Sequence, residues 1–306
     1  HVFEEGYIRP DWLTLEPSGV NGNSSLPRDP DWYIEQARVL PPLPQWPPIT
    51  ASFNRRARDA YRYYSRVWLT KPFYPFYNSH RKGSLFLEGL GWLRKFAVKK
   101  REAAKADAVS QKLKNTPYFL FPLQLSTDYQ IRAHSPFLHM EEAIEYVLFS
   151  FARRAPEATR LLIKEHPLDA GLTGWSSRIR AISRKAGVSD RILHIAGGNL
   201  ETLAAGALGM VTVNSTSATL ALQAGIPTMA LGKAIYAING LTHQGKLDDF
   251  WVRPQTPNAE VYEAFRRVLY DRCLIYGGLA SESATQKLVE SAVERLMGLR
   301  LSRWTT

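Results

Sequence analysis

The sequence predicts an α/β protein with a doubly wound parallel sheet in its C-terminal part, and three observations support this prediction. From residue 116 onward, short apolar runs alternate with amphipathic segments of helical period. The apolar runs stop at turn residues, as strands that precede a crossover helix do. The chain has 306 residues with 45% hydrophobic content, enough for a substantial core around such a sheet.

The segment before this sheet differs in composition. The first 50 residues are rich in Pro, Gly, Asn and Asp, which favours turns and irregular loops over helices, with a short strand at residues 2–3. Two helices are expected next, over residues 54–68 and within 84–115. Gly89 and Gly91 weaken the first turns of the second helix.

In the α/β part, the apolar runs predict five strands, over residues 117–124, 159–167, 191–197, 210–215 and 226–232. The amphipathic segments predict helices over residues 140–156, 175–188, 199–209, 217–225, 259–272 and 283–300. We expect Asn199 to cap the third of these helices and Gly225 to close the fourth.

Cysteine content and hydropathy exclude some classes of protein. The single cysteine, Cys273, excludes an internal disulfide framework and is typical of a reducing cytoplasm. We expect it to be a small buried hydrophobic residue. No apolar run approaches the roughly 20 residues that span a bilayer. The chain begins with His1 and not with methionine, so we expect further sequence before it.

The net charge of +11 is concentrated in one segment. Residues 55–114 contain 16 Lys and Arg residues against four acidic residues, a net charge of +12. Such a basic block indicates an anionic partner such as phospholipid, nucleic acid or a phosphorylated sugar, or else a solvated helix face. Nucleic acid is disfavoured because no known readout motif is present. Apolar side chains above the Lys/Arg cluster suggest an interfacial helix; they are Leu85, Leu87, Leu90, Trp92, Leu93 and Phe96.

Polar residues follow two of the expected strands at their carboxyl ends, where an open parallel sheet binds its ligand. Lys164 and His166 end one strand, and hydroxyl-bearing residues before a helix, which can bind an anion, end another. Together they predict a phosphate site. Taken singly, such a histidine is usually a surface residue and such a turn only an N-cap. The residues of the turn are Asn214, Ser215, Thr216 and Ser217.

Other kinds of site lack their motifs. The sequence has no P-loop, GxGxxG, HExxH or CxxC, and Asp248-Asp249 is not the spaced Asp-x-Asp pair that usually holds a divalent metal for a sugar nucleotide. We therefore expect no cofactor and no metal. Three candidate carboxylates remain, each with an ordinary alternative as a surface or turn residue. They are Glu4, Glu5 and Asp128.

Four segments, in this order, resemble the bacterial capsule polysaccharide biosynthesis family of KpsS/LipB type: EEGYIRPDWLTLEPSGVNGNSSLP, FPLQLSTDYQIRAHSPF, IKEHPLDAG and VTVNSTSATLALQAGIPTMALGKAIYAINGLTHQGKLDDFW. The resemblance covers nearly the whole chain. It implies a GT-B-like glycosyltransferase fold whose N-terminal domain is incomplete here. It also implies a β-Kdo transferase, which moves Kdo (3-deoxy-D-manno-octulosonic acid) from CMP-Kdo to a phosphatidylglycerol-type lipid and so starts the capsule linker.

The resemblance also implies a division of the chain into four parts. They are the remainder of an N-terminal acceptor-side domain (1–53), a basic amphipathic helical segment (54–115), a Rossmann-like domain that binds the CMP-sugar (116–285) and a C-terminal helix (286–306).

The motifs further resemble those of bacterial sialyltransferases, which also use CMP-activated 2-keto acids. This implies Glu4 as the acid/base on the acceptor hydroxyl, with Glu5 less favoured, and Arg9 on the acceptor side. His166 would stabilise the phosphate as CMP leaves. Because retention of configuration favours a carboxylate nucleophile, Asp128 is the candidate for that role. The implied donor-binding residues are Lys164, His166, Asn214, Ser215, Thr216, Ser217, Gln124 and Asn199.

The same resemblance implies a cytoplasmic protein that is peripheral on the inner membrane. Its partners would be CMP-Kdo, an anionic phospholipid acceptor and other capsule assembly proteins, with no nucleic acid. The basic block fits such a membrane, because each Lys or Arg near an anionic surface contributes about 1 kcal/mol. Two alternatives stay open: a transferase for CMP-sialic acid or another CMP-sugar, and a non-catalytic capsule assembly or export factor.

Overall fold

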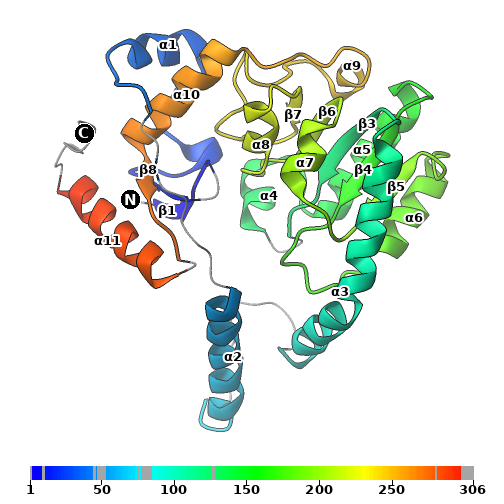
Figure 1. Ribbon diagram of the computed structural model, residues 1–306, viewed down its shortest axis with the longest axis horizontal. Coiled ribbons are helices and arrows are strands. Elements are labelled where there is room, and N and C mark those ends of the chain that lie inside the picture. The colour runs from blue at the N-terminus through cyan, green and yellow to red at the C-terminus, as the bar shows by residue number, and fades with distance from the viewer. Residues whose placement is uncertain are drawn as a thin grey trace.

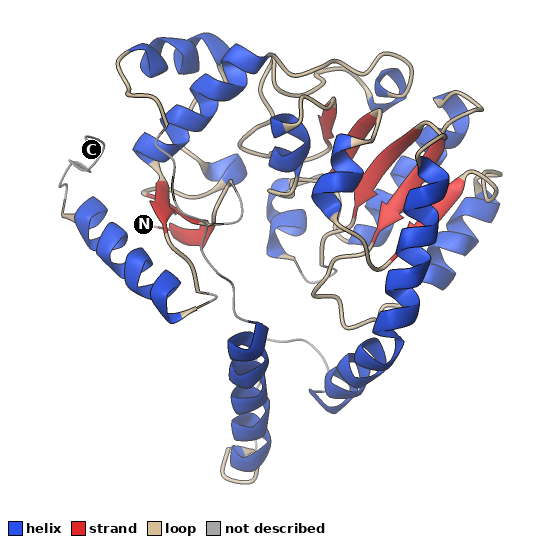
Figure 2. Ribbon diagram, in the orientation of Figure 1, coloured by secondary structure: helices blue, strands red, loops and turns tan. Residues whose placement is uncertain are grey.

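Two separate β-sheets with helices around them form the structure, which Figure 1 and Figure 2 show. The larger sheet is parallel and the smaller one is antiparallel. The predicted α/β class with a doubly wound parallel sheet is therefore confirmed. This computed structural model describes residues 2–8, 11–43, 46, 53–74, 76, 85–125, 128–279 and 281–297.

The larger sheet has five strands in the order β5-β4-β3-β6-β7. They are β3 (Tyr118–Pro122), β4 (Arg160–Lys164), β5 (Ile192–Ile195), β6 (Gly209–Thr212) and β7 (Thr228–Ala230). β4 and β5 extend the sheet on one side of β3, whereas β6 and β7 extend it on the other side. The winding direction therefore reverses between β3 and β6, and a sheet of this kind binds its ligand beyond the carboxyl ends of the strands at that point.

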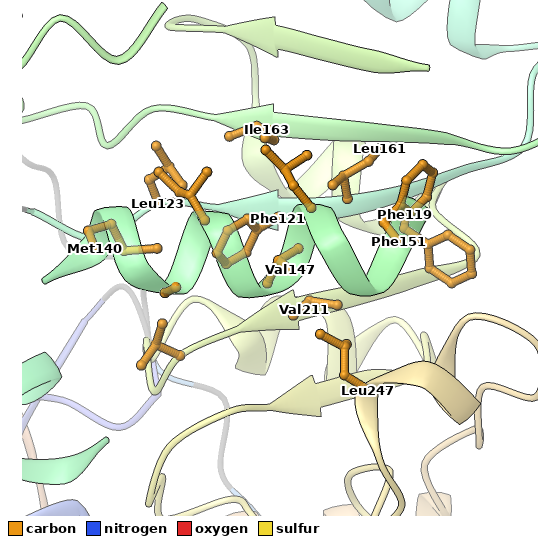
Figure 3. Close-up of a cluster of buried hydrophobic side chains, with 14 of the residues drawn as sticks. Phe119, Phe121, Leu123, Met140, Val147, Phe151, Leu161, Ile163, Val211 and Leu247 are labelled. Carbon is orange, nitrogen blue, oxygen red and sulfur yellow. The ribbon is translucent and has the colours of Figure 1, made fainter. Parts of the chain in front are cut away.

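Helices cover both faces of this sheet. They are α5 (Met140–Arg154) and α6 (Trp175–Lys185) on one face, and α3 (Leu85–Leu113), α7 (Leu200–Ala205) and α8 (Ala218–Gln223) on the other. Figure 3 shows Phe121 of β3 beside Val147 of α5 and Phe119 toward Phe151, while Leu120 belongs to the cluster on the opposite face. Because both faces are buried, the strands are continuous apolar runs.

The smaller sheet pairs the first two strands of the described chain with its last strand. β1 (Val2–Glu5) pairs with β2 (Trp12–Glu16), and β8 (Leu274–Tyr276) pairs with the other side of β2. The helices of this part are α1 (Pro30–Arg38) and α10 (Ala259–Arg272), which pack against each other, and α11 (Glu282–Leu296), which packs against β8. Cys273 is buried in the same core, as predicted.

The expectation of irregular structure over the first 50 residues is wrong for part of that segment. Leu13 and Leu15 of β2 alternate with other residues and pack in a cluster with β8 and α11. Asp29 caps α1 by accepting a hydrogen bond from the Asp31 backbone N–H, and Pro30 is at the start of the helix, where a proline loses no helical hydrogen bond. The Asp-Pro-Asp sequence is therefore a helix start and not a turn.

A short unpredicted helix, α9 (Leu247–Phe250), gives the Asp248-Asp249 segment a structural role. The Phe250 ring packs against Phe119 in β3, and a Cβ added at Gly209, the first residue of β6, would lie 2.7 Å from that ring. Asp248 accepts hydrogen bonds from side chains of α5. Phe119 and Gly209 are near the amino ends of their strands, so α9 lies away from the ligand edge.

The basic segment forms two helices, α2 (Phe53–Thr70) and α3. Figure 1 shows α2 extending away from both sheets. The second half of α3 packs on the larger sheet through Ala106 and Leu113. Gly91 marks a close approach, because a Cβ there would lie 2.7 Å from the Ala170 carbonyl oxygen. The glycine that weakens the helix in isolation therefore lets α3 contact the loop after β4.

We predict that Phe250→Ala lowers the free energy of unfolding by about 3–5 kcal/mol, because it leaves a cavity between α9 and the sheet. Urea unfolding followed by circular dichroism measures this change. Val252→Ala is the matched control, since the Val252 side chain is exposed and its loss should change stability by less than about 0.5 kcal/mol. Equal effects of the two substitutions would contradict the anchoring role of Phe250.

Candidate active site

Gln124 and Asn214 connect the two strands between which the sheet reverses. Gln124 follows β3 and Asn214 follows β6, and the two residues are only 5% and 2% exposed. The Gln124 Nε2 atom donates to Asn214 Oδ1 at 2.9 Å, and Gln124 Oε1 accepts from the Asn214 backbone N–H at 3.1 Å. This reciprocal pair fixes the carboxyl ends of β3 and β6 relative to each other, at the edge where a ligand is expected.

Asp128 belongs to the same network. Its Oδ2 atom accepts from Gln124 Nε2 at 3.1 Å, and its Oδ1 atom accepts from the Gln130 backbone N–H at 2.9 Å. The second bond caps α4 (Tyr129–His134), which is the turn role that the sequence left as an alternative. Because each carboxylate oxygen accepts a hydrogen bond, the Asp128 side chain is held in one orientation beside the site.

A loop of the N-terminal part reaches this network. The Asn21 side chain donates to Gln130 Oε1 at 2.9 Å and accepts from the Ile235 backbone N–H at 3.2 Å. Asn214 in turn donates to the Gln130 carbonyl oxygen at 2.7 Å. Asn21 has a φ of 50°, a left-handed conformation that asparagine tolerates better than most residues. Gln130 thus links the two parts of the molecule at the site.

A buried carboxylate holds that loop in place. The hydroxyls of Tyr7 and Ser24 both donate to Glu16, and the Tyr7 hydroxyl also accepts from the Asn21 backbone N–H at 2.9 Å. Burial, followed by the hydrogen bond to Glu16, raises the pKa of Tyr7. Arg28 donates to the Asn21 carbonyl oxygen at 2.6 Å. Sequence analysis missed this cluster because its members are scattered through a Pro- and Gly-rich segment.

Lys164, the last residue of β4, is 5% exposed. Strand alternation places it on the same face of the sheet as Leu162, which packs in the cluster that contains part of α3. The Lys164 ammonium donates one long hydrogen bond, of 3.5 Å, to the Glu165 carbonyl oxygen. Burial lowers the pKa of Lys164, and the positive charge of Lys95 lowers it further.

His166 and Glu165 follow directly. The His166 Nδ1 atom accepts from the Leu168 backbone N–H at 3.1 Å, so in the neutral ring the proton is on Nε2, which can donate to an anion. Glu165 Oε1 lies 2.9 Å from His194 Nε2 on the neighbouring strand. The turn after β4 therefore contains an imidazole of fixed orientation and a carboxylate that faces a second histidine.

Lys95 of α3 reaches this turn, which the sequence did not predict. Its ammonium donates to the carbonyl oxygens of Pro167 at 2.7 Å and Asp169 at 2.6 Å. The Asp169 carboxylate accepts from the Gly171 backbone N–H and the Trp175 indole N–H, which closes the turn. Lys95 is more than 60 residues from these partners, so the sequence carried no signal beyond the basic composition of its helix.

The turn after β6 is bonded internally. The Ser215 and Ser217 hydroxyls are 2.8 Å apart, and Ser215 Oγ also accepts from the Ser217 backbone N–H at 3.2 Å. The Tyr236 hydroxyl donates to the Ser215 carbonyl oxygen at 2.6 Å. Thr216 between them is half-buried. These contacts account for the turn itself, and the donor-binding role of its residues stays a prediction.

The remaining predicted residues belong to other elements. Asn199 caps α7, as predicted, by accepting from the Thr202 backbone N–H. Glu4 and Glu5 are the last two residues of β1 in the smaller sheet, so the strand extends two residues beyond the predicted Val2-Phe3, and the Glu4 side chain is exposed. Arg9 lies outside the described residues. The structure thus places Gln124, Asp128 and Asn214 together. Lys164 ends the neighbouring strand β4, and His166 lies in the turn that follows it.

Comparison with known proteins identifies the family. A family model described as capsule polysaccharide biosynthesis protein matches residues 1–278. The chain belongs to this family.

Its curated relatives include two named proteins. The Escherichia coli capsule polysaccharide export protein KpsS is 36% identical over 273 residues, which cover 88% of this chain and 69% of that protein. The capsule polysaccharide modification protein LipB of Neisseria meningitidis serogroup B is 33% identical over 290 residues, which cover 92% of this chain and 68% of that protein. The resemblance found in the sequence is thereby confirmed.

Two solved structures from Thermosulfurimonas dismutans are also similar. The structure titled KpsC, beta Kdo 2,7 transferase has 16% identity and a TM-score of 0.46, with 94% of this chain and 76% of that chain covered. The structure titled KpsC, beta Kdo 2,4 transferase has 14% identity and a TM-score of 0.40, with 86% and 70% covered.

Two further features are absent from the part of the chain that the structure describes. Within it, no group of three or more His, Cys, Asp or Glu side chains could hold a metal ion. None of its helices is both long enough and apolar enough to span a bilayer.

We predict that Gln124→Leu lowers the free energy of unfolding by about 1–3 kcal/mol, because it leaves the buried Asn214 amide without its partner. Urea unfolding measures this, with Gln223→Leu on the exposed end of α8 as the control for the same chemical change. If Gln124→Leu were as stable as the control, the pair would not be the constraint described above.

Proposed function

We propose that this capsule-family chain is a retaining β-Kdo transferase, which moves Kdo from CMP-Kdo to a (lyso)phosphatidylglycerol-type lipid and initiates the capsule linker. The observation that carries the proposal is the carboxyl edge of the larger sheet. A buried ammonium (Lys164), an oriented imidazole (His166) and an oriented carboxylate (Asp128) follow adjacent strands there. The family membership and the motifs resembling CMP-sugar transferases support this substrate class.

On the donor side, the cationic residues suit a monophosphate. CMP carries a single phosphate, so no P-loop is required, and Lys164 with the Nε2–H of His166 would stabilise the charge as CMP departs. The hydroxyls of Ser215, Thr216 and Ser217, together with Gln124 and Asn199, would line the donor site. We expect no cofactor and no metal.

Retention follows from two inversions. In the first step, Asp128 attacks C2 of Kdo, the bond from C2 to the phosphate oxygen breaks, and CMP leaves with the electron pair. In the second step, the acceptor hydroxyl attacks C2, transfers its proton to Glu4 and releases the Asp128 carboxylate. Glu5 and Arg9 would lie on the acceptor side. The hydrogen bonds to both Asp128 oxygens support the first step because they hold the nucleophile without protonating it.

The basic helices supply a reason for a lipid acceptor. Exposed apolar side chains on α3, namely Leu90, Leu93 and Phe96, lie among its Lys and Arg residues. An anionic leaflet attracts such a surface through both burial and charge. We therefore propose a cytoplasmic protein that is peripheral on the inner membrane and meets CMP-Kdo, its lipid acceptor and other capsule assembly proteins there, without a role in nucleic-acid binding.

We predict that the protein forms an acceptor carrying one Kdo when it is incubated with freshly generated CMP-Kdo and fluorescent lysophosphatidylglycerol. Mass spectrometry of the lipid detects this product. Asp128→Asn should abolish it, because an amide cannot form the covalent intermediate. His166→Ala should slow the reaction about 100-fold or more, as loss of one charge-stabilising donor typically does.

Matched controls for these variants are Asp190→Asn and His139→Ala, which change exposed residues. Both should keep wild-type rates. If the protein formed product from CMP-sialic acid but not from CMP-Kdo, the proposed donor would be wrong and CMP-sialic acid would take its place. No product together with no binding of CMP would support a non-catalytic assembly or export factor instead.

We predict that the protein co-floats with vesicles that contain phosphatidylglycerol and binds neutral phosphatidylcholine vesicles much more weakly. Leu93→Ser should reduce this binding, because it removes an exposed apolar side chain (67% exposed) from the proposed contact surface. Leu296→Ser, a similarly exposed position on α11, should have no effect. Equal binding to neutral and anionic vesicles would rule out the electrostatic part of this proposal.

A further inference from the structure

The Lys164 ammonium is buried without adequate compensation. At 5% exposure it donates only the 3.5 Å hydrogen bond to the Glu165 carbonyl oxygen within the part of the chain that the structure describes. The adjacent Glu165 carboxylate has an oxygen 2.9 Å from His194, and its charge offsets only part of the cost of burying the ammonium, since burial is the larger influence on the pKa of Lys164. A buried charge is costly unless it is paired and hydrogen-bonded. A bound anion would supply this ammonium with both an opposite charge and hydrogen-bond acceptors.

A second ammonium, that of Lys95 on α3, is bonded to the turn that follows Lys164. Lys95 is half-buried, and its two hydrogen bonds to the turn after β4 occupy two of its three N–H donors. Its charge is close enough to lower the pKa of Lys164. Two like charges brought together in a partly buried place repel each other, and an anion between them reverses the sign of that interaction.

The position of Lys95 is fixed by packing. One turn earlier, Gly91 allows α3 to approach the Ala170 carbonyl oxygen, where a Cβ would lie 2.7 Å away. Further along, a Cβ added at Gly197, in the loop after β5, would lie 3.2 Å from the Glu102 carbonyl oxygen of α3. Helix α3 therefore contacts the loop after β4 before Lys95 and the loop after β5 beyond it. These two contacts hold Lys95 at the carboxyl edge of the sheet.

We infer that Lys95 and Lys164 form an anion-binding pair that holds a charged group of the activated-sugar donor, and that α3 is thereby part of the donor site. The group is a phosphate or a sugar carboxylate, which present the same oxygen acceptors to an ammonium. This inference rests on the proposed function for the identity of the donor. Lys95 also holds the backbone of the turn that contains His166, so it contributes both a charge and the position of that ring.

Calorimetric titration of the ligand-free protein tests the pair with three probes: CMP, which carries the phosphate, cytidine, which lacks it, and Kdo, which carries the carboxylate. Lys95→Met should weaken binding of CMP or Kdo about 10- to 100-fold, the usual effect of losing a charge-assisted hydrogen bond, and leave cytidine binding unchanged. Whichever anion is affected identifies the group that the pair holds. Lys95→Arg should restore most of the affinity because it keeps the charge.

Lys105→Met is the matched control, since Lys105 is an exposed lysine on the same helix. The Lys105→Met variant should bind all three probes as tightly as the wild type does. Thermal unfolding of each variant shows whether it is folded. Lys164→Met should unfold at the same or a higher temperature than the wild type without ligand, because it removes a buried charge, and should bind the same anion more weakly.

The outcomes separate the two levels of the proposal. If the wild type binds CMP or Kdo and folded Lys95→Met binds them equally well, the pair is overturned while the transferase stands. Equal loss of CMP and cytidine binding would show that Lys95 acts only through the fold and would also overturn the pair. A wild type that binds neither CMP nor Kdo would overturn the proposed donor together with the inference.

Discussion

The reciprocal hydrogen bonds between Gln124 and Asn214 are the constraint on which the geometry of the candidate site depends. They connect the only neighbouring strands of the described parallel sheet between which the winding reverses, and the same Gln124 amide also donates to Asp128. Because both side chains are buried, neither could lose its partner without leaving an unsatisfied polar group. The pair thus couples the spacing of β3 and β6 to the orientation of the candidate nucleophile.

The same pair connects the sheet to the N-terminal part of the chain. Asn214 donates to the Gln130 backbone, and the Gln130 side chain accepts from Asn21, whose loop is held by the buried Glu16. A displacement of that loop would therefore reach the site through three side chains. Glu16, which the sequence did not predict as part of the site, therefore supports the site indirectly. Burying its carboxylate is costly, and the hydrogen bonds from Tyr7 and Ser24 offset that cost.

Helix α3 combines two roles that composition alone did not separate. Its first turns expose Leu90 and Leu93 among basic residues, whereas Ala106 and Leu113 in its second half are core residues. Lys95 lies between these regions and bonds to the turn after β4. The helix is therefore continuous from the proposed lipid surface to the donor side, and a positive charge within a basic block has a specific structural partner.

The sequence by itself determined the α/β class, the five strands of the parallel sheet and the residues at their carboxyl ends, because these depend on local apolar runs and on turn chemistry. It gave the Asn199 cap correctly and placed Lys164, His166 and Asn214 at one edge, since parallel strands all end on the same side. It failed for β2 and α1, whose prolines and glycines resemble loop signals, and it gave no sign of α4 or α9.

Only the tertiary structure decided the strand order, the pairing of β8 with β2, and the contacts of Asn21, Glu16 and Lys95, because each joins residues that share no local pattern. A hydrogen bond between residues that are tens of positions apart produces no local pattern that a single sequence could reveal. Burial has the same property, since a lysine at the end of an apolar run can be solvated or enclosed. The Lys164 side chain is enclosed because α3 and its neighbours cover that face of the sheet, and that was decided by packing.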